Sequence, residues 1–121
     1  MRGTNVEVAG APAIPGLRFR TFTPDDYDEM ATVMNHVTRA DEGPDAWVWT
    51  VEFLKRMDSQ IPDFDPQRDR VIADVEGRMI GCGRVQHMKT LEKEHLYAHS
   101  FNLLPEWRRK GIGRASCRER V

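Results

Sequence analysis

Three strand-like segments joined by short connections occupy the second half of the chain, and they constrain its fold more than any other feature. Glycine, proline and charged residues bound each segment, as expected of strands. In order, the strands and turns are Arg70 to Val75, the pair Glu76-Gly77, Arg78 to Gln86, Lys89 to Lys93, and His95 to Leu104. Because tight turns join antiparallel neighbours, this half predicts a three-stranded antiparallel meander.

Two glycines, Gly81 and Gly83, interrupt the middle strand of this meander. Glycine weakens a strand, and it often marks a β-bulge or a place where another backbone or a ligand approaches closely. We therefore expect one of these features in the middle strand.

The first half of the chain predicts a strand followed by a helix. Leu17 to Phe22 alternates polar and apolar residues with the two-residue period of a half-buried strand. Thr23 suits the N-cap of a helix, and Pro24 suits its first position. Apolar residues then recur at helical spacing; they are Tyr27, Met30, Ala31, Met34 and Val37.

A second helix is predicted after a loop at Asp41 to Asp45. Thr50 suits its N-cap, and Pro62 ends it because proline lacks the amide and disfavours a helical residue before it. Asp63 to Arg68 predicts a polar turn before the meander. The side of the helix that carries apolar residues comprises Val51, Leu54, Met57 or Asp58, and Ile61.

The length and these patterns predict one ordered domain. Residues 1–15 are small and proline-rich without periodicity, so we expect a disordered leader. Structure is expected over residues 16–113, as a mixed α/β (α+β) fold in the order strand, helix, helix, meander. A chain of 121 residues has room for one such domain.

The composition argues against several classes of protein. Its 18 basic and 19 acidic side chains give a formal net charge of −1, which disfavours a nucleic-acid binder that relies on bulk charge. Cys82 and Cys117 fit no metal-ligand spacing and no disulfide framework, so no metal is expected and the reducing cytoplasm is the expected location. The longest apolar run is too short to span a membrane, and the N-terminus is too weakly apolar for a signal peptide.

The turn after the last strand carries the strongest functional signal. Gly111 and Gly113 stand where a strand is expected to pass into a helix, and the absence of side chains lets backbone amides approach a phosphate. Arg108, Arg109 and Lys110 add positive charge beside the helix dipole. This arrangement predicts an anion-binding turn.

The turn resembles the acyl-CoA loop of the GNAT superfamily, whose pattern is Q/R-x-x-G-x-G/A. Arg108, Gly111 and Gly113 match its three fixed positions, and Leu103-x-Pro105 resembles the apolar-x-Pro lead-in. The order of strand, two helices and three antiparallel strands is also similar to the first half of the family's fold. The resemblance implies the N-terminal part of a GNAT domain, truncated at the start of the CoA-loop helix, with acetyl-CoA or another acyl-CoA as co-substrate.

The resemblance also implies which residues bind this co-substrate. Backbone amides would bind the CoA pyrophosphate beside Arg108, and the backbone at the end of the last strand would pair with the pantetheine arm and the acyl carbonyl. The residues implied for the pyrophosphate are Arg108, Arg109, Lys110, Gly111, Ile112 and Gly113, and those for the pantetheine arm are Asn102, Leu103 and Leu104. The alternative is a solvated basic turn followed by a helix cap.

By the same resemblance, GNAT enzymes catalyse direct attack of an amine on the thioester, which requires a base for the ammonium and an acid for the thiolate. Histidine suits the first task because its pKa lies near working pH. The residues that share one face of the last strand by the two-residue period are His95, Tyr97, His99, Phe101 and Leu103. We expect His99 as the base, then His95, then Glu94 through a water, with Tyr97 as a candidate acid. The alternative is that these side chains are structural.

The loop after the first helix combines acidic residues with Trp47 and Trp49. The resemblance implies that this region helps to form the acceptor pocket, where an acidic and aromatic lining suits a cationic amine. The acidic residues are Asp41, Glu42 and Asp45. The alternative is a solvated loop whose tryptophans fold onto the core. The pattern does not distinguish a small-molecule amine from a peptide amine as the acceptor.

The last ten residues, Ile112 to Val121, are identical to the translation of a common sequencing adapter. They also lack the apolar residues at helical spacing that a helix packed on a sheet should show. We expect genuine coding sequence to end at or just after Gly111, and residues 114–121 to be a non-native tail. Ile112 to Ala115 agree with both the adapter and the family's usual Gly-Ile-Gly-Arg-Ala.

The expected function is transfer of an acetyl group from acetyl-CoA to an amine by a parent protein, of which this chain is an inactive fragment. One alternative is a non-catalytic acyl-CoA-binding domain of a tandem GNAT protein. The other alternative is a small nucleic-acid or protein interaction module that uses the basic residues Arg108 to Arg114. The acidic remainder of the chain argues against this module. No nucleic-acid or membrane partner is expected, and the candidate assemblies are a tandem GNAT domain or a homodimer.

Overall fold

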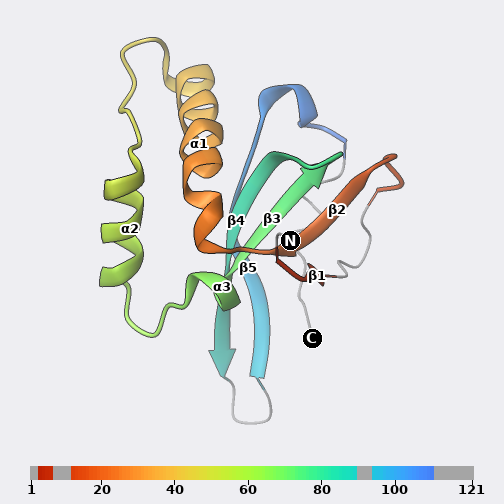
Figure 1. Ribbon diagram of the computed structural model, residues 1–121, viewed down its shortest axis with the longest axis vertical. Helices are drawn as coiled ribbons and strands as arrows, with labels where there is room; N and C mark the ends of the chain where they lie inside the picture. The colour runs from red at the N-terminus through yellow and green to blue at the C-terminus, as the bar shows by residue number, and fades with distance from the viewer. Residues whose placement is uncertain (1–2, 7–11, 90–93, 111–121) are drawn as a thin grey trace.

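One antiparallel sheet and two main helices make up the part of the chain that the structure describes. The computed structural model describes residues 3–6, 12–89 and 94–110, and for residues 85–89 and 94–100 it describes the backbone alone. The strands pair in the order β1-β2-β3-β4-β5, and α1 and α2 lie side by side next to the sheet (Figure 1). The elements are β1 Asn5–Val6, β2 Leu17–Thr21, the 3-10 turn η1 Pro24–Asp26, α1 Tyr27–Glu42, α2 Val51–Gln60, α3 Pro66–Asp69, β3 Arg70–Val75, β4 Arg78–Lys89, β5 Glu94–Leu103 and the 3-10 turn η2 Pro105–Trp107.

The predicted mixed α/β architecture and its antiparallel meander are confirmed. β3 pairs with β4, and β4 pairs with β5, each antiparallel. The hairpin residues Glu76 and Gly77 have φ angles of 51° and 81°, and positive φ at both central positions is typical of a two-residue hairpin turn. β4 continues past the predicted Gln86 to Lys89. The second predicted turn lies largely outside the described residues.

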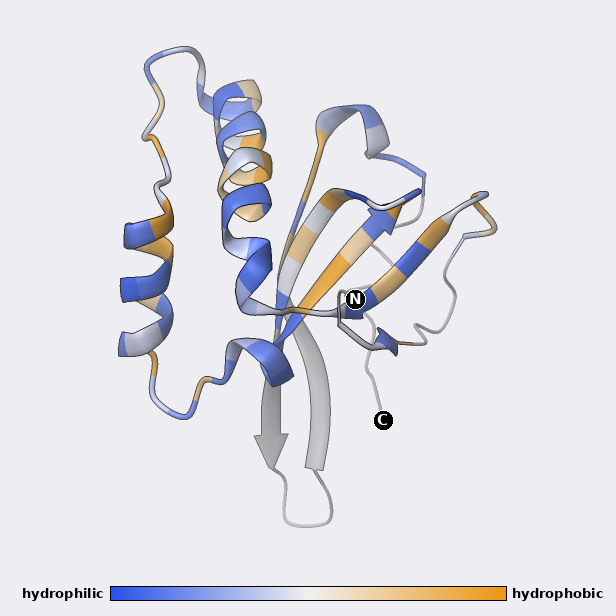
Figure 2. Cartoon of the chain, in the orientation of Figure 1, coloured by the Kyte–Doolittle hydropathy of each residue, from blue (hydrophilic) through white to orange (hydrophobic). Residues whose placement is uncertain are grey.

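Thr23 and Pro24, predicted to begin the first helix, instead begin the 3-10 turn η1, which leads directly into α1. The Thr23 amide and hydroxyl both donate to Asp26 Oδ2, at 2.9 and 3.2 Å. Figure 2 shows the apolar side of α1 turned toward the sheet and its hydrophilic side turned outward. The predicted stripe is buried, apart from the half-buried Met34, and Val33 adds to it.

The second helix also begins as predicted, because Thr50 Oγ1 accepts a hydrogen bond from the Phe53 amide at 3.1 Å. Leu54 and Asp58 are its buried residues. Two predictions near these helices were wrong. Asp41 and Glu42 belong to α1 and not to the loop, and the polar turn contains the four-residue helix α3, whose N-cap Asp65 accepts from the Gln67 amide at 3.0 Å.

The leader predicted to be disordered is in part ordered. Asn5 and Val6 form β1 and pair with Arg20 and Phe19 of β2. The Thr21 amide donates to the Thr4 carbonyl at 2.9 Å, and the Thr4 amide donates to Thr21 Oγ1 at 2.8 Å. Composition missed this strand because its pairing comes from the edge of β2 and not from its own apolar pattern.

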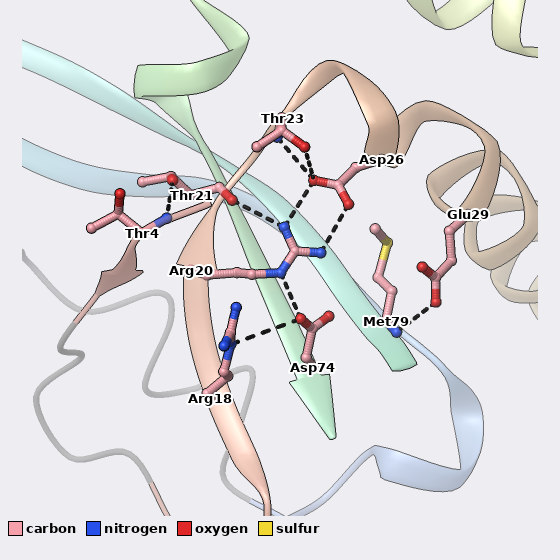
Figure 3. Close-up of polar contacts among 9 residues, drawn as sticks. All are labelled: Thr4, Arg18, Arg20, Thr21, Thr23, Asp26, Glu29, Asp74 and Met79. Atoms are coloured by element: carbon pink, nitrogen blue, oxygen red, sulfur yellow. Dashed lines mark hydrogen bonds and ion pairs between the residues drawn. The ribbon is translucent and has the colours of Figure 1, made fainter. Parts of the chain in front are cut away.

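Charged residues are buried where α1 meets the sheet (Figure 3). The fully buried guanidinium of Arg20 donates to Asp26 at 2.8 and 2.9 Å and to Asp74 at 2.5 Å. In a second cluster, the buried carboxylate of Asp58 in α2 accepts from the Tyr27 hydroxyl at 2.8 Å and pairs with Arg70 of β3. These two clusters attach both helices to the sheet.

The strand register assigns the sheet residues to two faces. Arg20, Ile72, Cys82 and Asn102 are successive Cα partners, so they share one face. Cys82 Sγ lies 3.9 Å from Met34 Sδ of α1, which identifies this as the helix-covered face. The partners on the opposite face are Phe19, Ala73, Gly81 and Leu103.

Candidate functional site

The candidate site comprises the end of β5, the turn that follows it, and the end of α1. The Leu104 amide donates to the Ile80 carbonyl at 2.9 Å, which places Leu103 and Gly81 in a non-hydrogen-bonded pair of the ladder. In such pairs the backbone groups point away from the partner strand. The N–H and C=O groups of Phe101 and Leu103 therefore face away from β4, along the outer side of the last strand in the described sheet.

Gly81 makes room for the side chains of this strand end. A Cβ at Gly81 would lie 2.9 Å from both Leu103 Cδ1 and Phe101 Cε1 and 3.0 Å from the Asn102 carbonyl oxygen. Leu103 and Phe101 thus lie across Gly81. The bulge expected at the glycines of β4 lies next to Gly81, because Ala73 pairs with Gly81 and Asp74 pairs with Met79, which leaves Ile80 without an opposed residue. Leu103 is buried and Phe101 is half-buried.

The pairing of β4 with β5 shifts by one residue at His99. Arg84 pairs with Ser100 and Val85 pairs with Ala98, so His99 has no opposed residue, as at a β-bulge. The two-residue period that assigned His95 to Leu103 to one face is interrupted at this point. For His95, Tyr97 and His99 the structure describes the backbone alone, and their catalytic roles stay predictions.

The turn after β5 is compact up to Lys110. Within η2 the Trp107 amide donates to the Leu104 carbonyl at 2.9 Å, and the Arg108 amide donates to the Pro105 carbonyl at 3.2 Å. Arg109 has a φ of 64°, the left-handed conformation common in tight turns. Lys110 Nζ lies 5.5 Å from the centroid of the Trp107 ring. The predicted glycine loop, Gly111, Ile112 and Gly113, lies outside the described residues.

Arg108 connects this turn to the end of α1. Its Nη1 and Nη2 donate to the two carboxylate oxygens of Asp41 at 2.8 and 3.2 Å. Its Nε donates to the Leu103 carbonyl at 3.3 Å. The hydrogen bond from Arg108 lowers the pKa of Asp41, and the same contact raises the pKa of Arg108, so both groups are charged at neutral pH.

Sequence reasoning named Arg108 but missed Asp41 as its partner. The two residues are 67 positions apart, and Asp41 was predicted to lie in the acceptor loop. A carboxylate in the last turn of a helix is unfavourable to the helix dipole, and this misplaced charge is the signal in the sequence that could have indicated a partner elsewhere.

Trp49 attaches the loop after α1 to that helix by hydrogen bonds. Its amide donates to Asn35 Oδ1 at 2.7 Å, its carbonyl accepts from Asn35 Nδ2 at 3.0 Å, and its indole donates to Thr38 Oγ1 at 3.0 Å. Trp47 and Val48 stay exposed, at 58% and 60%. Trp49 therefore folds onto the helix, whereas Trp47 presents an apolar surface to solvent beside Phe53, 5.3 Å away between ring centroids.

Cys82 has no sign of a catalytic role. It is buried beneath α1, and burial raises the pKa of its thiol to about 11, so the neutral thiol predominates at pH 7. Within the part of the chain that the structure describes, no group of three or more histidine, cysteine or acidic side chains could hold a metal ion. None of the helices described there is long and apolar enough to cross a membrane.

Comparison with known protein families matches residues 29–119 to the Acetyltransferase (GNAT) family. That match covers most of the chain. The chain belongs to the GNAT family. The match includes the whole of β5 and the turn that carries Arg108 to Lys110, as the sequence resemblance implies. No curated protein matches the chain significantly.

Solved structures of GNAT proteins share this fold. A GNAT family acetyltransferase from Staphylococcus aureus subsp. aureus USA300_TCH1516 is 22% identical with a TM-score of 0.57, and the match covers 82% of this chain and 70% of that one. An aminoglycoside acetyltransferase from an uncultured soil metagenomic sample, in complex with sisomicin, is 16% identical with a TM-score of 0.56, over 84% of this chain and 64% of that one.

A third structure, the ribosomal-protein-S18-alanine N-acetyltransferase from Escherichia coli, is 14% identical with a TM-score of 0.53. The match covers 83% of this chain and 54% of that one. This GNAT chain thus spans between about half and 70% of the length of these three structures. At such identities the likeness establishes the fold alone. It does not identify the acceptor of this chain, because the names of these neighbours indicate different acceptors.

Proposed function

We propose that the full-length protein transfers an acetyl group from acetyl-CoA to an amine by direct attack of the amine on the thioester. One observation carries the proposal. The backbone groups of Phe101 and Leu103 face the outer edge of β5, and this edge leads without a break into a turn that carries three cations.

The described residues fit an acyl-CoA. The Leu103 amide is free of the β4 ladder and can donate to an extended amide chain lying along the edge, as in strand addition. Beyond it, Arg109 and Lys110 are exposed, and they supply positive charge where a pyrophosphate would follow. The thioester supplies the electrophilic acyl group and the thiolate leaving group.

For the acid–base steps, we retain His99 as the first candidate base, followed by His95, and then Glu94 through a water, with Tyr97 as the candidate acid. The bulge adds a reason to favour His99, since β-bulges are over-represented next to active sites. Replacing His99 by Gln should remove from the profile of kcat/KM against pH the acidic limb, which is the fall in activity at low pH as the base becomes protonated. An unchanged profile would assign the proton transfer to another residue.

The acceptor is proposed to be a small-molecule or peptide amine. Aminoglycosides and an alanine of ribosomal protein S18 are the acceptors that two neighbours' names indicate. The exposed Trp47 and the acidic Asp45 at the loop after α1 favour a cationic amine here, because an aromatic face and a carboxylate both attract an ammonium. The cytoplasm is the proposed location, and the 121-residue chain alone is proposed to be inactive.

The experiment starts from a long sequencing read across the locus, which defines the complete reading frame. The complete protein is then assayed for CoA thiol release from acetyl-CoA with aminoglycosides, polyamines and peptides with a free N-terminus. Amine-dependent thiol release supports the proposal. Binding of acetyl-CoA without turnover on any amine would favour the non-catalytic acyl-CoA-binding domain, and absence of binding would overturn both.

A further inference from the structure

The guanidinium of Arg108 is already engaged by the chain itself. Two of its nitrogens meet the carboxylate of Asp41, and the third donates to the Leu103 carbonyl. A guanidinium forms the same bidentate pair with a carboxylate as with a phosphate, so the edge that meets Asp41 is not available to a phosphate at the same time. Within the described residues, neither Arg109 nor Lys110 has a carboxylate partner.

The three groups that meet at Arg108 come from different elements. Asp41 belongs to the last turn of α1, which is fixed by the buried Val37 and by the Gly43 amide that donates to the Arg39 carbonyl at 2.9 Å. Leu103 is the last residue of β5. The turn beyond them is held by the two backbone hydrogen bonds of η2 and by the half-buried Trp107, which packs against the core. Arg108 connects this turn to the end of α1.

We propose that Arg108 is a positioning residue and not an acyl-CoA ligand: Asp41 holds it against the Leu103 carbonyl, which fixes the path of the turn that leads to Gly111. In this arrangement the pyrophosphate is met by Arg109, Lys110 and backbone amides. The inference rests on the proposed function and assigns different roles to the three cations of the turn.

The two possible roles of Arg108 predict opposite effects of neutralising Asp41. If Arg108 binds the pyrophosphate, Asp41→Asn frees it and removes a negative charge nearby, and both changes favour an anion. If Arg108 positions the turn, the same substitution loosens the turn and weakens binding in spite of the more favourable charge. The sign of the change in Kd therefore separates the two roles.

The experiment measures the Kd of CoA for the complete protein by titration calorimetry. We expect Asp41→Asn to raise Kd about three- to fivefold, the size that an exposed bidentate pair allows. Arg108→Gln should raise Kd to a similar extent, and the double variant should be no worse than either single one because the two residues act as a unit. Asp41→Glu should restore part of the affinity.

A matched control and a kinetic readout exclude a general loss of structure. Glu42→Gln removes the same charge from the same exposed helix end and should leave the Kd for CoA unchanged. Asp41→Asn should raise KM for acetyl-CoA with kcat unchanged, since uniform binding of co-substrate is what changes.

Each other outcome overturns the inference. Unchanged or tighter CoA binding by Asp41→Asn, together with weaker binding by Arg108→Gln, would make Arg108 a ligand of the anion. A wild-type protein that binds no CoA would overturn the proposed function, and this inference would fall with it.

Discussion

Arg20 is a buried charged residue whose environment restricts substitution. Its side chain is completely buried, and two carboxylates compensate its charge. Burial alone would lower the pKa of Arg20, but the hydrogen bonds to Asp26 and Asp74 outweigh it and raise the pKa. Asp26 accepts two hydrogen bonds from the Arg20 guanidinium, whereas Asp74 accepts one. Asp26 also accepts from the Thr23 amide.

Replacing Asp26 by Asn should therefore destabilise the protein at neutral pH. Asp74 still balances the charge of Arg20, but Asn turns an amide NH2 toward one guanidinium N–H and leaves a buried donor unsatisfied, which typically costs about 1 to 3 kcal/mol. Urea unfolding at pH 7 measures the loss. The adjacent Asp25 is exposed, so Asp25→Asn is the matched control and should change the free energy of unfolding by less than about 0.5 kcal/mol.

The same substitution predicts how stability depends on pH. Burial alone would raise the pKa of Asp26, but the hydrogen bonds from Arg20 and Thr23 and the charge of Arg20 together outweigh it and lower the pKa below the ordinary 3.8. A depressed pKa stabilises the fold above the unfolded-state value, and that stability is lost as pH falls through the folded-state pKa. Wild type and Asp26→Asn should therefore converge in stability as pH falls below about 4. A difference that stays constant down to pH 2 would contradict this account.

At the scale of elements, local signals in the sequence predict most of the fold. Thr50 and Pro62 bound α2 because a cap and a chain break act on nearby backbone. The Glu76-Gly77 turn fixes the β3–β4 hairpin because few residue pairs accept positive φ twice. The four-residue helix α3 was missed, since one helical turn has no period to detect and depends on the cap at Asp65.

The elements of the site are predicted less well, because their geometry depends on pairing between distant segments. The shift at His99 belongs to the register of β4 against β5, and neither strand encodes it locally. The Arg108 motif is visible in the sequence, whereas its ion pair with Asp41 requires the end of α1 to lie beside the end of β5. Local chemistry thus identified the turn, and tertiary packing decided which of its cations is already paired.

At the scale of the whole molecule, the two faces of the sheet differ in polarity. The helix-covered face carries the buried charged clusters around Arg20 and Asp58, whereas Cα partners such as Phe19, Ala73 and Leu103 make the opposite face apolar. Beyond β2 the sheet ends in the short strand β1. β1 therefore covers an edge of β2 that would otherwise present unpaired backbone groups.

Deleting residues 1–6 should expose this edge. The Thr21 amide donates to the Thr4 carbonyl, so its hydrogen-exchange protection should fall by at least about tenfold once that acceptor is gone. The neighbouring amide of Arg20 faces β3 by the alternation of the ladder, and it is the matched control that should keep its protection. Equal protection of Thr21 in both proteins would mean that β1 does not cover β2 in solution, and residues 1–6 would then be the disordered leader that their composition predicts.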